Sequence, residues 1–117
     1  MKRELGEAFP SFEAALTQPP PVSLRLNPLK PAAGFEKLEK VPWHPEGRYL
    51  PERPVFTLDP LFHAGAYYVQ EASSMFIYQA LRQCTDLSQK IRVLDLCPAP
   101  GGKSTLLARQ LADVVCW

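Results

Sequence analysis

The segment formed by residues 91–112 constrains the fold of this chain more than any other. Its first part, residues 93–96, is a short and mostly apolar run, and a loop rich in proline and glycine follows it directly. Leucines then recur at helical spacing from residue 106, behind Ser104, whose side chain is a good helix N-cap. The pattern predicts a buried parallel strand, a tight turn and a helix. In sheets of this kind, ligands bind in the crevice above the carboxyl end of the strand.

The loop residues narrow the choice of ligand. The loop ends in the Gly-Lys-Ser of a P-loop, but Cys97 stands where that motif has its first glycine. Pro98 and Pro100 lack the backbone N–H groups that a phosphate cradle needs. Gly101 and Gly102 are adjacent, so the dinucleotide motif G-x-G-x-x-G is also absent. The sequence therefore favours a ligand without phosphates that approaches the backbone closely.

Three segments carry a resemblance to a known family. Residues 94–103 read L-D-L-C-P-A-P-G-G-K, which resembles the S-adenosylmethionine motif L-D-x-C-A-A-P-G-G-K of the Sun-type (NOL/NOP/Sun) RNA cytosine-C5 methyltransferases. The one departure is Pro98 in place of alanine. Residues 23–28, S-L-R-L-N-P, and residues 63–75, H-A-G-A-Y-Y-V-Q-E-A-S-S-M, are similar to two further elements of the family, in the same order. The resemblance runs from about Ser23 onward and is greatest to the bacterial ribosomal-RNA members.

The resemblance implies an α/β fold in two parts. Residues 66–117 would be the start of a Rossmann-like S-adenosylmethionine-dependent methyltransferase domain, and residues 1–65 a small, proline-rich α+β subdomain before it. The apolar end of the chain, residues 113–117, predicts the opening of a second strand, so the sheet would be unfinished. We therefore interpret the chain as an N-terminal fragment of a longer methyltransferase.

The resemblance also places S-adenosylmethionine at the glycine loop. The residues that it implies as cofactor-binding are Cys97, Pro98, Ala99, Pro100, Gly101, Gly102 and Lys103. Lys103 opposes the positive end of a helix dipole, so we expect it to serve the cofactor carboxylate or the substrate backbone. Cys97 is expected to be a small buried residue packed under the cofactor, because no general base is apparent beside it. Asp95 is compatible with cofactor binding and equally with binding the amides of its own loop.

RNA, in particular ribosomal RNA, is the substrate that the resemblance implies. The net charge of +1 gives no basic surplus that would indicate nucleic acid by itself. Arg25 and Asn27 alternate with Leu24 and Leu26, so they lie on the opposite face of a predicted strand. Both are candidate substrate-binding residues, and a solvated sheet edge is the alternative for each.

No catalytic residue is assigned within this chain. In the family, a cysteine thiolate adds to C6 of cytosine and the methyl group passes to C5. The family's catalytic cysteines follow Pro or Thr, whereas Cys84, Cys97 and Cys116 follow Gln, Leu and Val. The nucleophile is therefore expected beyond Trp117, and the fragment alone is expected to be inactive. A non-catalytic RNA-binding module on the same fold is the alternative function, and an adenylate- or dinucleotide-dependent enzyme is a more distant third.

Composition excludes several other classes. Three widely spaced cysteines form neither a disulfide framework nor a C-x-x-C zinc motif, and His44 has no partner at metal-ligand spacing, so no metal site is expected. No apolar run approaches the roughly 18 to 20 residues that cross a membrane. We expect a cytoplasmic protein that is monomeric at full length.

The remaining elements follow from local patterns. Apolar spacing predicts a helix over residues 9–16 with Ser11 as its cap, and a strand over residues 22–27. Asp59 before Pro60 predicts a short capped helix that Gly65 can close. A further helix, with Met75, Phe76, Ala80 and Leu81 on its apolar face, is expected from Ala72 to about Cys84. The proline-rich stretch between residues 19 and 60 predicts turns and short extended pieces.

Overall fold

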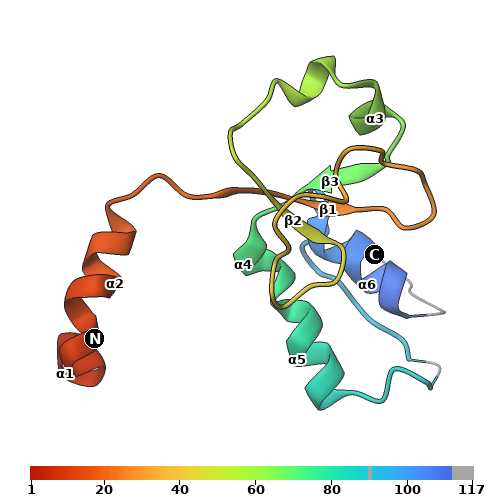
Figure 1. The fold of residues 1–117 in the computed structure, drawn as a ribbon. Coiled ribbons are helices and arrows are strands. Elements are labelled where there is room, and N and C mark those ends of the chain that lie inside the picture. The colour runs from red at the N-terminus through yellow and green to blue at the C-terminus, as the bar shows by residue number, and fades with distance from the viewer. Residues whose placement is uncertain (90, 112–117) are drawn as a thin grey trace.

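The computed structural model describes residues 1–89 and 91–111. Its centre is a three-stranded antiparallel sheet in the order β2-β1-β3 (Figure 1). The strands are β1 (Val22–Leu26), β2 (Gly47–Leu50) and β3 (Tyr67–Val69). The central strand places Arg25 opposite Gly47 on one side and opposite Tyr68 on the other. The described part of the chain is thus a mixed α/β structure.

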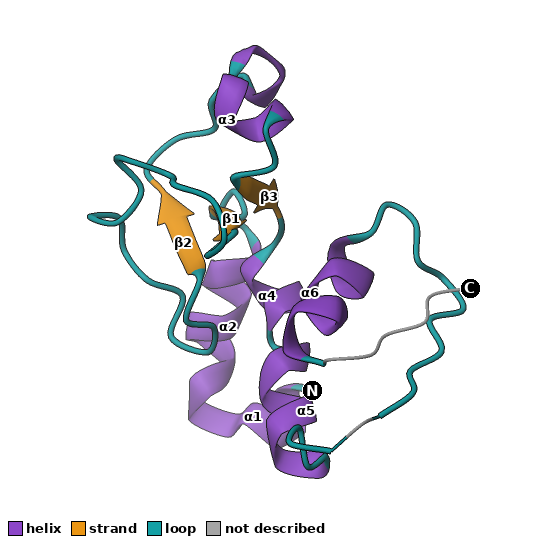
Figure 2. Cartoon of the chain, turned by 90° about the vertical axis from the view of Figure 1, so that its right-hand side faces the viewer, coloured by secondary structure: helices purple, strands orange, loops and turns teal. Residues whose placement is uncertain are grey.

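The helices of the described residues are short. They are α1 (Lys2–Leu5), η1 (Gly6–Ala8), α2 (Phe9–Leu16), η2 (Phe56–Leu58), α3 (Pro60–His63), α4 (Ala72–Met75), α5 (Ile77–Cys84) and α6 (Gly102–Gln110). Helices α1 and α2 form an arm that stands apart from the sheet at the end of an extended linker (Figure 1). Helices α4, α5 and α6 lie together, and α6 contacts both α4 and α5 (Figure 2).

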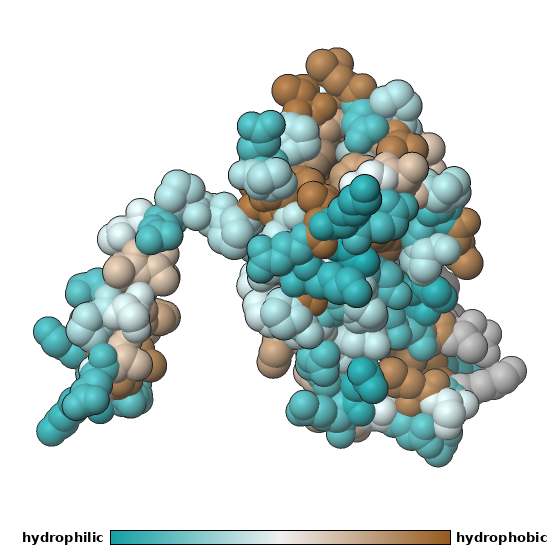
Figure 3. Space-filling view, viewed as in Figure 1, coloured by the Kyte–Doolittle hydropathy of each residue, from teal (hydrophilic) through white to brown (hydrophobic). Residues whose placement is uncertain are grey.

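Two apolar clusters hold the sheet in place. One contains Leu24, Phe56 and Tyr67, and the other contains Val41, Ala72 and Met75. The first joins the sheet to the η2 and α3 segment, and the second joins β2 to α4. Burying a Leu, Phe, Val or Met side chain of these clusters stabilises the folded state by roughly 1.5–3 kcal/mol. Apolar side chains also remain exposed over the η2 and α3 segment (Figure 3).

Gly47 is needed where β2 begins. A Cβ atom at this position would lie 2.7 Å from Val41 Cβ and 3.0 Å from Met75 Sδ. These distances leave no room for a side chain. The cluster of Val41, Ala72 and Met75 can therefore pack against β2 only if residue 47 is a glycine.

Most of the local expectations are confirmed. The helix over residues 9–16 forms as predicted, and the predicted strand forms over residues 22–26, so that Asn27 lies just outside it. Asp59 caps α3 by accepting a hydrogen bond from the backbone N–H of Leu61. Ser11 does not act as a cap, because its hydroxyl donates to the Ala8 carbonyl instead.

The helix predicted from Ala72 is divided into α4 and α5, and Phe76 lies at the junction. Phe76 is 56% exposed rather than part of a buried face, while Met75 is fully buried. The Phe76 ring lies 6.1 Å from the ring of Trp43, in an edge arrangement. The predicted apolar face was therefore right for Met75 and wrong for Phe76 and Ala80, which are both exposed.

The strand predicted at residues 93–96 is not formed. This segment pairs with no strand in the described part of the chain, and Leu94 and Leu96 are 62% and 79% exposed. A strand needs a hydrogen-bonded neighbour, and none of the three strands in the described residues pairs with this segment. The second expected strand, residues 113–117, lies outside the described residues.

The predicted domain boundary at residue 65 stays a prediction. Directly after it, β3 pairs with β1, so the sheet is built from residues on both sides of that boundary.

Candidate functional site

The glycine loop forms the N-terminus of α6. Gly101 is the residue before the helix and has φ +102°, a conformation that residues with side chains rarely adopt. Gly102 opens the helix, and a Cβ atom there would lie 3.3 Å from Tyr68 Cε1 and 3.4 Å from Gln70 Nε2. Glycine is therefore needed at the two positions for different reasons. At residue 101 it allows the left-handed backbone conformation, and at residue 102 it allows the backbone to lie close to Tyr68 and Gln70. Ser104, the expected N-cap, lies inside the helix instead.

Asp95 ties the two ends of the loop together. One carboxylate oxygen accepts the backbone N–H of Cys97 at 3.0 Å, and the other accepts the Ser104 hydroxyl at 2.7 Å. These bonds, chiefly the one from Ser104, lower the pKa of the Asp95 carboxyl below its usual value, with a smaller contribution from Lys103. The sequence left two roles for Asp95, binding the cofactor or binding its own loop. The structure shows Asp95 bound to its own loop.

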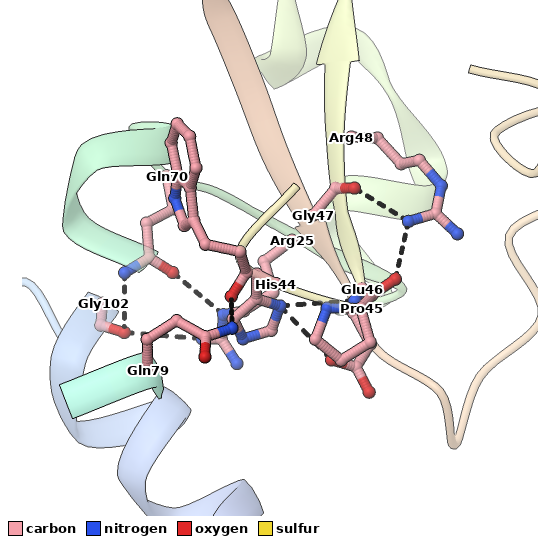
Figure 4. A network of polar contacts seen from close by, with 10 residues as sticks. Arg25, His44, Pro45, Glu46, Gly47, Arg48, Gln70, Gln79 and Gly102 are labelled. Carbon is pink, nitrogen blue, oxygen red and sulfur yellow. Dashed lines mark hydrogen bonds and ion pairs between the residues drawn. The ribbon is translucent and has the colours of Figure 1, made fainter. Parts of the chain in front are cut away.

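Arg25 and Gln70 form a buried clamp between the sheet and the loop (Figure 4). Arg25 Nε donates to Gln70 Oε1 at 2.9 Å, and its Nη2 donates to Thr105 Oγ1 at 2.6 Å. Gln70 Nε2 donates in turn to the Gly102 carbonyl at 3.2 Å. Burial lowers the pKa of the Arg25 guanidinium, but an arginine still stays charged in proteins. The clamp therefore fixes the first turn of α6 against β1.

Tyr68 and Ser23 extend this clamp. The Tyr68 hydroxyl donates to the Pro100 carbonyl at 2.9 Å, and the Arg25 guanidinium lies 5.9 Å from the centre of the Tyr68 ring. The Ser23 hydroxyl donates to the backbone carbonyl of Gln70 at 2.7 Å. Loop, strand and helix are thus joined by a continuous set of hydrogen bonds.

A cavity of about 210 Å³ lies over the loop. It is lined by Tyr68, Val69, Gln70, Glu71, Ser74, Cys97, Pro98, Ala99, Pro100, Gly102 and Lys103. Six of the seven residues expected to bind a cofactor meet in this one cavity, and Gly101 supplies the turn that shapes it. The expected burial of Cys97 is wrong, because its side chain is exposed. The charged groups in the lining are Lys103 and Glu71.

Asn27 lies on a different, larger groove of about 460 Å³, which Arg25 also lines. Its side-chain amide donates to the Gly65 carbonyl at 3.0 Å and accepts the backbone N–H of Leu29 at 3.1 Å. Asn27 thereby holds two turns together at the end of β1. The assignment of Arg25 and Asn27 to substrate binding stays a prediction.

His44 is buried and packs its ring 4.9 Å from the ring of Tyr78. Its Nδ1 accepts the backbone N–H of Glu46 at 3.3 Å. Burial, with a smaller effect of Arg25, lowers its pKa to about 4, so the ring is neutral at physiological pH. Within residues 1–89 and 91–111, no cluster of three metal-ligating side chains is found, and no helix has the length and apolar character of a membrane span.

Sequence reasoning missed Tyr68, Gln70 and Thr105. A signal for the first two was present, because Tyr68 and Gln70 alternate with Tyr67 and Val69 and so face the other side of a strand. Thr105 gave no signal, since its partner Arg25 lies 80 residues away in the sequence.

Comparisons with known proteins identify relatives of this chain. Residues 1–72 match the family described as the N-terminal domain of 16S rRNA methyltransferase RsmF. Proteins named ribosomal RNA small subunit methyltransferase F are similar over most of the chain. The one from Cronobacter sakazakii is 36% identical over 118 residues, covering 88% of this chain and 24% of that protein. The one from Klebsiella pneumoniae is 36% identical over 120 residues, covering 91% and 24%.

The relative from Escherichia coli O157:H7 is 35% identical over 128 residues, covering 92% of this chain and 26% of that protein. The chain thus spans about a quarter of the length of these relatives. Its similarity to them includes the glycine loop as well as the N-terminal sheet. The family membership expected from the three sequence motifs is confirmed, and the chain belongs to the RsmF family of 16S rRNA methyltransferases.

Proposed function

We propose that this chain carries the S-adenosylmethionine loop of an enzyme that methylates C5 of a cytosine in ribosomal RNA. The observation that carries the proposal is the cavity over residues 97–103, where a close-packed glycine and a lysine line the same space. The names of the relatives support the reaction class and the RNA.

The charges of the cavity suit one end of the cofactor. The amino-acid end of S-adenosylmethionine carries a carboxylate and an ammonium group, and the cavity offers Lys103 for the first and Glu71 for the second. At about 210 Å³, the cavity is smaller than the roughly 300–1,000 Å³ of a complete ligand site. In this proposal it holds only that end of the cofactor. The exposed Leu94 and Leu96 support a Rossmann-like strand that forms when neighbouring strands cover it.

The residues of this chain have a binding role in the proposed reaction. S-adenosylmethionine supplies an electrophilic sulfonium methyl group. Lys103 and Glu71 orient its amino-acid end, and the clamp of Arg25 and Gln70 keeps the loop from moving under it. The thiolate that adds to C6 of cytosine belongs, in this proposal, to a cysteine after Pro or Thr beyond Trp117. It leaves again when C5 loses its proton, so the described residues alone would bind without transferring the methyl group.

Isothermal titration of the full protein with S-adenosylmethionine, its demethylated product and ATP tests the cofactor. We expect the first two to bind and ATP not to. Gly101→Ala should abolish that binding, because φ +102° is strained for alanine in the loop itself. Gly34→Ala is the matched control: Gly34 has φ +97° and, like Gly101, no close neighbour, but it lies far from the cavity in the sequence and does not line it.

Equal losses of affinity in the two glycine variants would show that the effect is general strain. Tighter binding of ATP than of S-adenosylmethionine would overturn the proposed cofactor. Binding without transfer of a labelled methyl group to ribosomal RNA would favour a non-catalytic RNA-binding module.

A further inference from the structure

The larger groove lies directly beside the cofactor cavity. It has a volume of about 460 Å³ and is bounded by the end of β1, the turn at Gly65 and the last turns of α6. Tyr68 lines both spaces, so its side chain is part of the wall between them. Because the wall is shared, a molecule in the groove would lie next to a molecule in the cavity.

The charged side chains that line the groove are all positive. Arg25 and Arg109 line it, and no carboxylate does. The Arg25 guanidinium is already hydrogen bonded to Gln70 and Thr105. Arg109 is exposed at the end of α6 and forms no ion pair within the part of the chain that the structure describes. Arg109 is therefore the cation that the groove offers to an anionic ligand.

The rest of the lining is mostly apolar or aromatic. Leu26, Pro28, Leu29 and Ala108 contribute carbon surface, and Tyr68 contributes an aromatic ring. A phosphate together with a planar base needs this combination of one cation and an apolar, partly aromatic surface, as in other sites for single-stranded nucleic acid. The volume is within the roughly 300–1,000 Å³ range of small-ligand sites and accommodates one nucleotide.

We propose that this groove binds one nucleotide of single-stranded RNA, with the Arg109 guanidinium on its phosphate and the base against the wall that contains Tyr68. The inference rests on the proposed function, because it takes RNA as the substrate. It adds a residue, Arg109, and places a nucleotide of the substrate strand beside the cofactor loop.

A purely structural role for Arg109 is the competing explanation. A cation in the last turn of a helix stabilises the helix dipole without touching a ligand. Arg82 offers a matched control, because it is also an exposed arginine in the last turn of a helix, α5, and does not line the groove. Arg82 lies 5.6 Å from the centre of the Tyr78 ring, but it is remote from the groove. If the groove binds RNA, only the loss of Arg109 should lower the affinity for RNA.

The experiment compares Arg109→Gln and Arg82→Gln in the full protein. Binding of a fluorescent single-stranded ribosomal-RNA segment is measured over a range of salt concentrations, and S-adenosylmethionine binding is measured separately by titration. We expect Arg109→Gln to weaken RNA binding and to lower the slope of log affinity against log salt by about 0.7, the value for one phosphate of a single strand. Cofactor affinity should be unchanged, and Arg82→Gln should match the wild type.

A second pair of variants keeps the arginine in place. Ala108→Glu adds a carboxylate to the groove and should weaken RNA binding, whereas Ala80→Glu, an exposed alanine on α5, should not. Wild-type affinity and slope in both Arg109→Gln and Ala108→Glu would overturn the inference, as would equal losses in the control variants. If the wild-type protein does not bind S-adenosylmethionine, the proposed function is contradicted instead. A failure of the inference and a failure of the proposed function are therefore distinguishable.

Discussion

Single residues in the glycine loop have separable roles. Gly101 provides a left-handed backbone, Gly102 allows contact with Tyr68 and Gln70, and Asp95 holds the loop ends by two hydrogen bonds. Cys97 has none of these tasks: its backbone N–H is held by Asp95, but its thiol is exposed.

Cys97→Ala should therefore be nearly silent for stability. Surface substitutions of this kind change the free energy of unfolding by about 0.5 kcal/mol or less. In the full protein, a covalent adduct with RNA that contains 5-fluorocytosine should still form, because Cys97 is not the proposed nucleophile. Gel analysis of the trapped adduct and thermal unfolding measure the two effects. Loss of the adduct in this variant would place the nucleophile in the loop.

At the scale of elements, the periodicity of the sequence predicts some structures and not others. The alternation at residues 22–27 identifies β1, and the aspartate before Pro60 identifies α3. Strand β2, with 4 residues, is too short for a periodic signal, and β3, with 3 residues, gives only the brief alternation of residues 67–70. Their pairing with β1 joins segments far apart in the sequence, which local patterns do not encode. The apolar run at residues 93–96 gave a strand signal, but within residues 1–89 and 91–111 no partner strand pairs with it.

The turn that leads into β2 contains a titratable core residue, His44. Its pKa is lowered from 6.5 to about 4 in the folded state, so the unfolded chain binds more protons between these values. The free energy of unfolding should therefore fall as the pH is lowered from about 6.5 to about 4. Urea unfolding across this range measures the effect.

His44→Phe should keep the ring against Tyr78 but abolish this pH dependence. His63→Phe, at an exposed histidine, should retain it. A pH profile in His44→Phe that is as steep as that of the wild type would contradict the assignment. At neutral pH the variant should be somewhat less stable, because the Glu46 backbone N–H loses its acceptor.

At the scale of the whole molecule, the clamp joins two regions that the sequence separates. The family match ends at residue 72, yet Arg25 and Gln70 reach Gly102 and Thr105 on α6. The sequence located the loop and the family, but not the buried hydrogen bonds that hold the loop to the sheet. Such bonds depend on which side chains meet after folding, and partners 45 and 80 residues apart leave no local pattern.

Gln70→Ala should loosen this junction. It leaves Arg25 Nε without its acceptor in a buried position, at a cost of about 1–3 kcal/mol, and removes the donor to Gly102. We expect weaker cofactor binding together with lower stability, measured by titration and urea unfolding. Gln79→Ala is the control, because its side chain donates to the Trp43 carbonyl, away from the loop. If both variants bound the cofactor equally well, the clamp would not position the loop.

The position of Tyr68 has a thermodynamic consequence. Its side chain borders two spaces, and its hydroxyl holds the Pro100 carbonyl of the loop between them. A molecule that shifts the ring from either side changes the free energy of occupancy on the other side. Linkage makes this coupling reciprocal, so the factor by which one ligand alters the affinity of the second equals the factor in the reverse direction. The order in which two ligands bind then depends on their association rates. The coupling free energy between them depends on the one side chain that both ligands contact.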